Sequence, residues 1–206
     1  NLKVAPRPIG TPYVKGTSIL TLRAYVQAEH PDHETAIVAA MSDATRAVCE
    51  GKVLPSGWYP QEAYTEFIEC TARGVDPQRP ERVAFDWGCW QVREDLGRGI
   101  YKAFLNFISP SIALKLAARL WGLYNKTGQL RVERLGDTHA RIVIDGFHGR
   151  SRLHWDALRG FCHQLAALSG AASHELETVA NAYKTLAGMS NEQLLARIDE
   201  AADTQG

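Results

Sequence analysis

The stretch DLGRGIYKAFLNFISPSIALKLAARLWGLYNKTGQLRVERLGDTHARIVIDGF, residues 95–147, decides the fold class of this chain. It begins with apolar residues at helical spacing, which the Ser-Pro pair at 109–110 interrupts because proline ends a helix. After a turn at Gly128, apolar and charged residues alternate over 130–135 and again over 140–147. Alternation with a period of two predicts a hairpin with one buried and one wet face. The stretch therefore predicts helices followed by a small antiparallel sheet.

The residues before this stretch predict further helices. Apolar side chains recur at i, i+3 and i+4 over 18–30, 33–50, 58–74 and 83–108. Thr17 or Ser18 is the expected N-cap of the first helix, whose β-branched start also allows a strand. The third helix is expected to open with Trp-Tyr-Pro at 58–60, because proline is tolerated in a first helical turn. A helix over 111–125 follows the Ser-Pro break.

After the hairpin, residues 152–155 allow a short third strand, and Asp156 is the expected cap of a helix that ends near 168. Two more helices are expected over 171–202, separated at Gly188. The fold class is therefore α+β: a mostly helical N-terminal part packed on a small antiparallel sheet, with C-terminal helices. We divide the chain into a flexible lead-in (1–14), an α+β domain (15–170) and a C-terminal helical extension (171–206).

Composition bounds the function. The 206 residues are 45% hydrophobic and 22% charged, with 23 basic and 23 acidic residues, which is typical of a globular protein. A neutral chain carries no overall field for nucleic acid, and no apolar run reaches the length of a membrane span. The four cysteines, at positions 49, 70, 89 and 162, stand without CxxC spacing. They indicate buried thiols in a reducing cytoplasm rather than a disulfide framework.

No nucleotide-binding, hydrolase or zinc-protease motif occurs, and we expect no catalytic residue, metal or cofactor. Two alternatives stay open. Cys89 lies between Gly88 and Trp90 and could border a pocket, and the His30-Pro-Asp-His33 corner brings two imidazoles near a carboxylate. Either would make the protein an enzyme, which we regard as the less favoured class.

A basic face is expected around the hairpin. It would be formed by Arg131, Arg134, Arg141, Arg150 and Arg152. Such a face could bind a phosphorylated ligand, an acidic partner or RNA, or could simply be solvated. Nucleic acid remains the less favoured partner, because the chain as a whole is neutral.

A series of short motifs carries a resemblance to a known family. They are KGTSIL (15–20), WYPxxxY (58–64), DLGRG (95–99), SP (109–110), LWxxYxxxG (120–128) and LRG (158–160). On these motifs, residues 15–170 resemble a family of myxobacterial paralogous proteins of unknown function. That family is similar to the ligand-binding superfamily of haem-nitric-oxide-binding sensors, 4-vinyl-reductase-type domains and TRAPP vesicle-tethering subunits. The resemblance implies a ligand pocket between helices and a small antiparallel sheet.

The sequence departs from the haem-binding members of that superfamily at two places. Their proximal histidine lies on the helix before the proline break, where this chain has Leu96, Gly97 and Arg98. Their Tyr-x-Ser-x-Arg motif is replaced at 124–128 by a segment without that serine or arginine. The resemblance therefore implies the architecture without haem.

The expected function is a non-enzymatic regulatory or sensor-type domain that binds a small apolar ligand or a protein partner. The alternative is a dimeric interaction or scaffold module that uses the hairpin edge or the C-terminal helices. Glycines allow close approach and aromatic residues supply apolar wall. The candidate pocket residues are Trp87, Trp90, Gly97, Gly99, Phe104, Trp121 and Tyr124.

Overall fold

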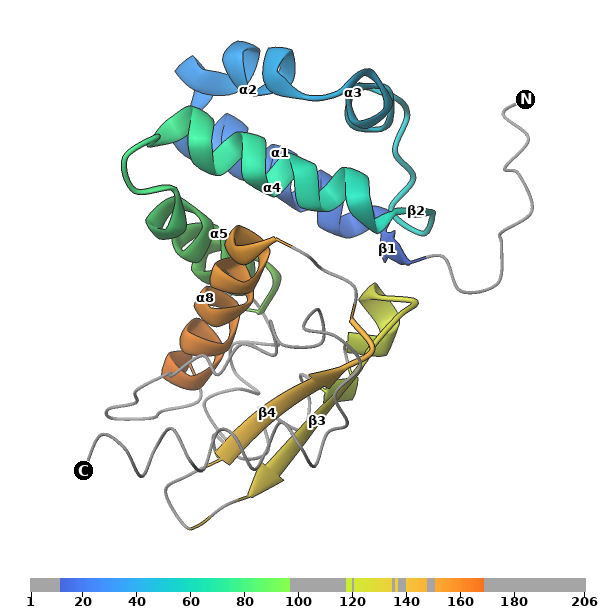
Figure 1. Cartoon of the computed structure of the whole chain (residues 1–206), viewed down its shortest axis with the longest axis vertical. Coiled ribbons are helices and arrows are strands. Elements are labelled where there is room, and N and C mark those ends of the chain that lie inside the picture. The colour runs from blue at the N-terminus through green and yellow to red at the C-terminus, as the bar shows by residue number, and fades with distance from the viewer. Residues whose placement is uncertain are drawn as a thin grey trace, which may run out of the picture. The chain divides into compact units, whose positions relative to one another are not determined.

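The computed structural model describes residues 12–96, 118–119, 121–134, 136, 140–147 and 151–168, all of which belong to the part of the chain numbered 1–174 (Figure 1). The expected helical residues 97–108 and the C-terminal helices over 171–202 lie outside the described residues. Of the helix expected over 111–125, residues 118–119 and 121–124 are described and are helical.

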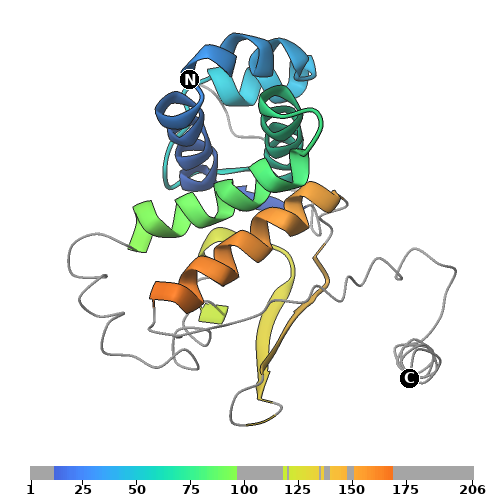
Figure 2. The same ribbon diagram turned by 90° about the vertical axis from the view of Figure 1, so that its left-hand side faces the viewer.

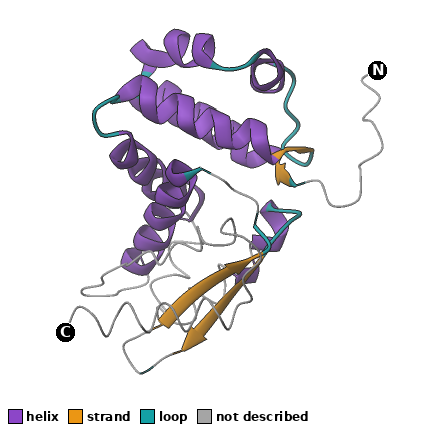
Figure 3. Ribbon diagram, viewed as in Figure 1, coloured by secondary structure: helices purple, strands orange, loops and turns teal. Residues whose placement is uncertain are grey.

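Helices dominate the described residues, with two short sheets (Figure 3). The helices are α1 (Gly16–Glu29), the 3-10 turn Pro31–His33, α2 (Glu34–Ala40), α3 (Asp43–Glu50), α4 (Gln61–Val75), α5 (Pro80–Leu96) and α8 (Arg152–Leu168). The strands are β1 (Tyr13–Lys15), β2 (Trp58–Pro60), β3 (Gln129–Arg134) and β4 (Ala140–Asp145), with β1 antiparallel to β2 and β3 antiparallel to β4. The α+β fold class is confirmed.

Helix α4 is the central helix of the described part. It contacts α1, α2, α3, α5 and α8. Its expected inward face is confirmed, because Tyr64, Phe67, Ile68 and Thr71 are all buried. These positions repeat at intervals of three and four, so one stripe of the helix faces its neighbours. Burial of such large apolar side chains is the main term that holds these helices together.

Helix α1 is confirmed, but its expected cap is wrong. The helix begins at Gly16, and Lys15 precedes it without a side-chain capping bond. The first N–H groups of a helix lack partners within the helix. Here the Gly16 N–H donates to the Gly57 carbonyl (2.9 Å), and the Thr17 N–H donates to the Pro55 carbonyl (3.2 Å). Neither Thr17 nor Ser18 is needed as a cap, because the turn before β2 supplies the acceptors.

The single helix expected over 33–50 is wrong, because the chain breaks between α2 and α3. Ser42 is the N-cap of α3, and its side chain accepts a hydrogen bond from the Thr45 N–H. The Glu66 carboxylate of α4 accepts hydrogen bonds from the Ser42 N–H (2.6 Å), the Ser42 hydroxyl (2.8 Å) and the Thr45 hydroxyl. The start of α3 is therefore fixed by a side chain of another helix.

The prediction that Trp-Tyr-Pro at 58–60 opens a helix is wrong, because these residues form strand β2. Tyr13 pairs with Pro60 and Lys15 pairs with Trp58 across the two strands. Strand β1 begins at Tyr13, inside the segment expected to be a lead-in. The Asn125 backbone forms a further bridge to Val14 on the other side of β1.

The hairpin is confirmed, and its register pairs four of the apolar residues with one another, all of them half-buried. Leu130 lies opposite Ile144 and Val132 opposite Ile142, whereas Glu133 lies opposite Arg141. The third strand expected over 152–155 is wrong, because α8 begins at Arg152. Asp156 therefore lies inside the helix rather than at its cap, and it is buried.

Helices α5 and α8 lie side by side (Figure 2), and their backbones touch. A Cβ atom added to Gly88 would lie 1.9 Å from the Ala157 carbonyl oxygen. One added to Gly160 would lie 1.9 Å from the Phe85 carbonyl oxygen. Only a residue without Cβ allows this approach, so the two glycines set the distance between the helices.

A search of the described helices for one long and apolar enough to cross a bilayer found none.

Candidate functional site

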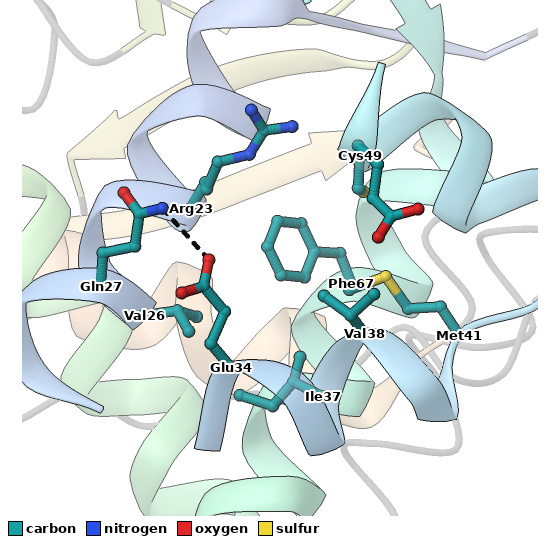
Figure 4. A pocket seen from close by; sticks show the side chains of 10 residues that line it. Arg23, Val26, Gln27, Glu34, Ile37, Val38, Met41, Cys49 and Phe67 are labelled. Atoms are coloured by element: carbon teal, nitrogen blue, oxygen red, sulfur yellow. Dashed lines mark hydrogen bonds between the residues drawn. The ribbon is translucent and has the colours of Figure 1, made fainter. Parts of the chain in front are cut away.

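A pocket with a volume of about 270 Å³ lies between α1, α2, α3 and α4 (Figure 4). It is lined by Arg23, Val26 and Gln27 of α1, Glu34, Ile37 and Val38 of α2, Met41 at the C-terminal cap of α2, Cys49 and Glu50 of α3, and Phe67 of α4. Sites for drug-sized ligands usually measure about 300–1,000 Å³, so this pocket is smaller than most of them.

The inner wall of the pocket is apolar. Val26, Ile37, Met41, Cys49 and Phe67 are all at least nine-tenths buried and belong to the hydrophobic core. Figure 4 shows the Phe67 ring at the centre of the view, with the Val38 and Met41 side chains to its right. An aromatic ring and a thioether give a soft apolar surface that adapts to ligands of different shape.

The outer rim of the pocket is polar. The Gln27 side-chain amide donates a hydrogen bond of 3.1 Å to the Glu34 carboxylate, which lies across the pocket from Met41 (Figure 4). Gln27 and Glu50 are exposed and Glu34 is half-buried. Water therefore solvates the rim, which screens its carboxylates.

Arg23 is the cation of this lining, and its guanidinium is incompletely paired. Its Nη2 atom is buried and has no hydrogen-bond partner. A buried donor without a partner costs about 1–3 kcal/mol, and more when the group is charged. The pocket thus combines an apolar wall with a donor that lacks an acceptor.

The Cys49 thiol forms part of the wall and is a poor nucleophile. Burial raises its pKa to about 11, although the nearby Arg23 guanidinium acts to lower it. The thiolate is the reactive form of cysteine, and it is scarce at neutral pH when the pKa is this high. Cys49 therefore behaves as a small apolar residue of the pocket.

The aromatic residues expected to line a pocket lie elsewhere. Trp87 is 1% exposed, and the gap beside it leaves no room for a water molecule. Trp90 is partly buried, and its indole N–H donates to the Glu29 carboxylate (3.0 Å). Both rings pack on Tyr25, with centroids 5.4 and 5.5 Å from its ring. These two tryptophans are therefore part of the α1–α5 packing.

Two of the remaining predicted pocket residues lie in the described part of the chain, and three lie outside it. The Trp121 indole N–H is shared between the carbonyls of Thr127 and Gly128, at 3.3 and 3.1 Å, so it closes the turn before β3. Tyr124 is half-buried. Neither lines the α1–α4 pocket. Gly97, Gly99 and Phe104 lie outside the described residues.

The basic face of the hairpin is largely neutralised where it is described. Arg131 pairs with Glu133 and with Asp145, and Arg141 lies 3.8 Å from Glu133. Arg152 is exposed at the start of α8. The side chain of Arg134 and the whole of Arg150 lie outside the described residues.

The candidate metal corner is held by other contacts. His30 Nε2 lies 3.0 Å from the Tyr25 hydroxyl, and burial, with a smaller effect of His33, lowers the pKa of His30. Within the described ranges, no group of three or more histidine, cysteine, aspartate or glutamate side chains could hold a metal ion.

Cys89 lies at the crossing of α5 and α8. Its thiol donates to the Gly160 carbonyl (3.2 Å), and burial raises its pKa to about 11. The thiol thus has a structural partner and little thiolate character. All four cysteines are free; Cys49 and Cys89 are buried as expected, whereas Cys70 and Cys162 are only partly buried.

His154 is a buried histidine of α8. Its Nδ1 lies 3.0 Å from the Thr65 hydroxyl, and its ring meets Tyr64 and Phe147 edge to face at 5.5 and 5.2 Å. Burial lowers its pKa to about 4. The neutral imidazole therefore joins α8 to α4 and to Phe147, two residues after the end of β4.

One feature of the sequence indicates the pocket, although the apolar periodicity alone did not reveal it. Ile19, Arg23 and Val26 follow one another at intervals of four and three, so a guanidinium lies in the apolar stripe of α1. A charged residue in a buried stripe indicates either a partner or a ligand.

No protein-family model, curated protein or solved structure matches this chain, so the resemblance drawn from its motifs stays a prediction.

Proposed function

We propose that the protein is a non-enzymatic binding module, of a regulatory or sensor type, whose α1–α4 pocket takes a small apolar ligand with an anionic head group. The observation that carries the proposal is the unpartnered Arg23 Nη2 in a pocket with an apolar wall. A carboxylate is a strong hydrogen-bond acceptor for a guanidinium, and a ligand carboxylate would accept a hydrogen bond from the Arg23 Nη2 atom.

The preference for an anion follows from the different environments of the charges. Glu50 is exposed and Glu34 already accepts a hydrogen bond from Gln27. Their fields are weakened by water at the rim, whereas the buried part of the Arg23 guanidinium is not solvated. A ligand whose apolar chain lies against Phe67 and whose head reaches Arg23 would use both surfaces.

Arguments from the thiols favour binding over catalysis. The thiol in the pocket, Cys49, has a raised pKa, and the same holds for Cys89 outside it. Free cysteines also suit a reducing compartment such as the cytoplasm.

The test compares three probes that share one eight-carbon chain: octanoate, octanol and octylamine. Each is titrated into the protein, and the thermal shift and the NMR chemical-shift changes are measured. We expect octanoate to bind about tenfold or more tightly than octanol, which corresponds to one charge-assisted hydrogen bond, and octylamine to bind most weakly.

Two matched arginine variants locate the effect. Arg23→Met keeps the apolar stem and should abolish the preference for octanoate, without lowering the stability of the ligand-free protein. Arg73→Met removes an equal charge from α4, where Arg73 is exposed and lies 4.0 Å from Glu69, and should leave the preference intact. Equal binding of octanoate and octanol to the unmutated protein, or equal loss in both variants, would refute the proposal.

A further inference from the structure

A second surface, independent of the pocket, joins two lysines to one tryptophan. The ammonium group of Lys15 lies 4.5 Å from the centroid of the Trp58 ring, and that of Lys126 lies 4.2 Å from it. We call these three residues the Lys–Trp–Lys patch. They come from β1, from β2 and from the segment between residue 124 and β3.

Backbone pairing holds the patch together. Lys15 and Trp58 are paired residues of β1 and β2, so their side chains lie on the same face of that sheet. The neighbouring residue of β1, Val14, points to the opposite face and is 1% exposed. The Lys126 N–H donates to the Tyr13 carbonyl (2.9 Å), which fixes this residue at the other edge of β1. The patch therefore lies on the face directed away from the core.

The two charges of the patch lack an anionic partner among the described residues. Since both nitrogens lie within 4.5 Å of one centroid, they are at most about 9 Å apart, close to the screening length at physiological salt. Two cations held this near each other repel, and neither forms an ion pair with a described carboxylate. Trp58 is half-buried, and a cation–π contact near the surface stabilises by only about 0.5–1 kcal/mol. An external anion would relieve this repulsion.

Two exposed aliphatic residues belong to segments that adjoin the patch in the chain or through a backbone contact. Leu54 is 52% exposed and Leu123 is 62% exposed, and these are the large exposed hydrophobic residues of the described part of the chain. The Leu54 carbonyl lies against Gly16, the residue after Lys15. Leu123 lies in the helical turn that leads to Asn125, which bridges to β1. Apolar residues beside an aromatic and a pair of cations are typical of a protein interface.

We propose that the Lys–Trp–Lys patch docks an acidic segment of a partner protein, with the partner's carboxylates on Lys15 and Lys126 and its apolar side chains on Leu54 and Leu123. Charge complementarity selects the acidic segment. The two exposed leucines favour protein over nucleic acid, and so does the zero net charge of the chain, because nucleic-acid binding relies on a broader basic field.

The test uses a short fluorescein-labelled peptide of leucine and glutamate, its counterpart with glutamine in place of glutamate, and a single-stranded DNA oligonucleotide. Fluorescence anisotropy with the full chain at about 0.15 M salt reports binding. We expect the acidic peptide to bind, and the glutamine peptide and the DNA to bind at least about tenfold more weakly. In NMR spectra, the indole resonance assigned to Trp58 by the Trp58→Phe variant should shift, whereas that of buried Trp87 should not.

Variants then distinguish this surface from general electrostatics. Lys15→Gln combined with Lys126→Gln should weaken the peptide about tenfold or more, and so should Leu54→Ser combined with Leu123→Ser. Lys52→Gln is the matched control, because Lys52 is an exposed lysine two residues before Leu54 that makes no contact with the Trp58 ring. It should change the affinity less than about twofold.

Several results would overturn the docking proposal. They are no binding of the acidic peptide, a loss in Lys52→Gln equal to that in the double lysine variant, and an unmoved Trp58 resonance. Binding of the DNA that is as tight as binding of the peptide would assign the patch to nucleic acid instead. Because Arg23 is not part of the patch, Arg23→Met should leave peptide binding unchanged, so the two proposals can fail separately.

Discussion

Gly88 of α5 and Gly160 of α8 lie at the same crossing, and each faces the backbone of the opposite helix. A Cβ atom on Gly88 would meet the Ala157 carbonyl, and one on Gly160 would meet the Phe85 carbonyl, in both cases at 1.9 Å. Backbone atoms cannot rotate away as a flexible side chain can. The two helices would have to separate to admit even a methyl group.

We therefore expect Gly88→Ala and Gly160→Ala each to destabilise the protein. Overpacking of this kind costs about 1–3 kcal/mol or more, and it outweighs the roughly 1 kcal/mol that alanine gains over glycine in a helix. Urea denaturation monitored by circular dichroism measures the difference. Gly122→Ala is the control, because a Cβ atom there meets nothing within 4 Å. A loss in the control as large as that in the two test variants would contradict the tight crossing.

Acidification should destabilise the fold through His154. Its pKa is about 4 in the folded state because burial disfavours the charged imidazole, against about 6.5 for a free histidine. As the pH falls below about 6.5, the unfolded chain binds the proton first, so stability falls until about pH 4 and then levels off with respect to this group. The expected loss is of the order of 3 kcal/mol.

Denaturation midpoints between pH 7 and pH 4 measure this loss. His154→Gln should have a lower stability at pH 7 but a flatter dependence on pH. An unchanged slope in His154→Gln would show that other groups cause the acid sensitivity.

Removal of the Glu66 carboxylate should loosen the start of α3. Burial alone would raise the pKa of Glu66, but the hydrogen bonds from Thr45 and Ser42 together lower it below its usual range. The bonds therefore favour the ionised carboxylate, and their stabilising effect is lost as the pH falls through the lowered pKa. We expect Glu66→Ala to cost about 1–2 kcal/mol, the range of a lost helix cap.

Glu69→Ala provides the comparison for that prediction, because Glu69 lies on the same helix and its contact among the described residues is a long one, 4.0 Å from the exposed Arg73. It should change stability by less than about 0.5 kcal/mol. Hydrogen exchange of the α3 amides should speed up in Glu66→Ala and not in Glu69→Ala. Equal exchange rates in the two variants would show that Glu66 does not stabilise the start of α3.

The thiols should react slowly with an aromatic disulfide reagent in the native protein. Burial raises the pKa values of Cys49 and Cys89 to about 11, and it also raises the pKa of Cys70. Reaction near neutral pH should therefore be slow, with Cys70 first because it is the more exposed of the three. All four cysteines should react promptly after denaturation. Rapid labelling of Cys89 in the native protein would support the alternative that Cys89 acts as a nucleophile.

The hairpin and the main helices could be predicted because their signals are local. Alternation over Leu130, Val132, Ile142 and Ile144 requires only that one face be buried, and the register follows that pattern. The inward face of α4 is equally local, since Tyr64, Phe67, Ile68 and Thr71 repeat with the helical period.

The errors have their cause in residues far along the chain. Trp58–Pro60 is a strand because β1 lies beside it, and α3 starts at Ser42 because Glu66 of α4 holds that turn. The pocket could not be located because it needs four helices in place. Its apolar wall has the same sequence pattern as ordinary core, and only the unpaired atom of Arg23 marks it as different.

The bridge between β1 and Asn125 has a consequence for the order of folding. Helices α1 to α4 are made from contacts close together in the chain, whereas the Val14–Asn125 bridge and the bond from Lys126 to Tyr13 close a long loop. Loop closure loses entropy before any contact compensates for it. Helices α1 to α4 should therefore pack together first. The Lys–Trp–Lys patch, which needs Lys126 beside β1, should form in the last and slowest kinetic phase of folding.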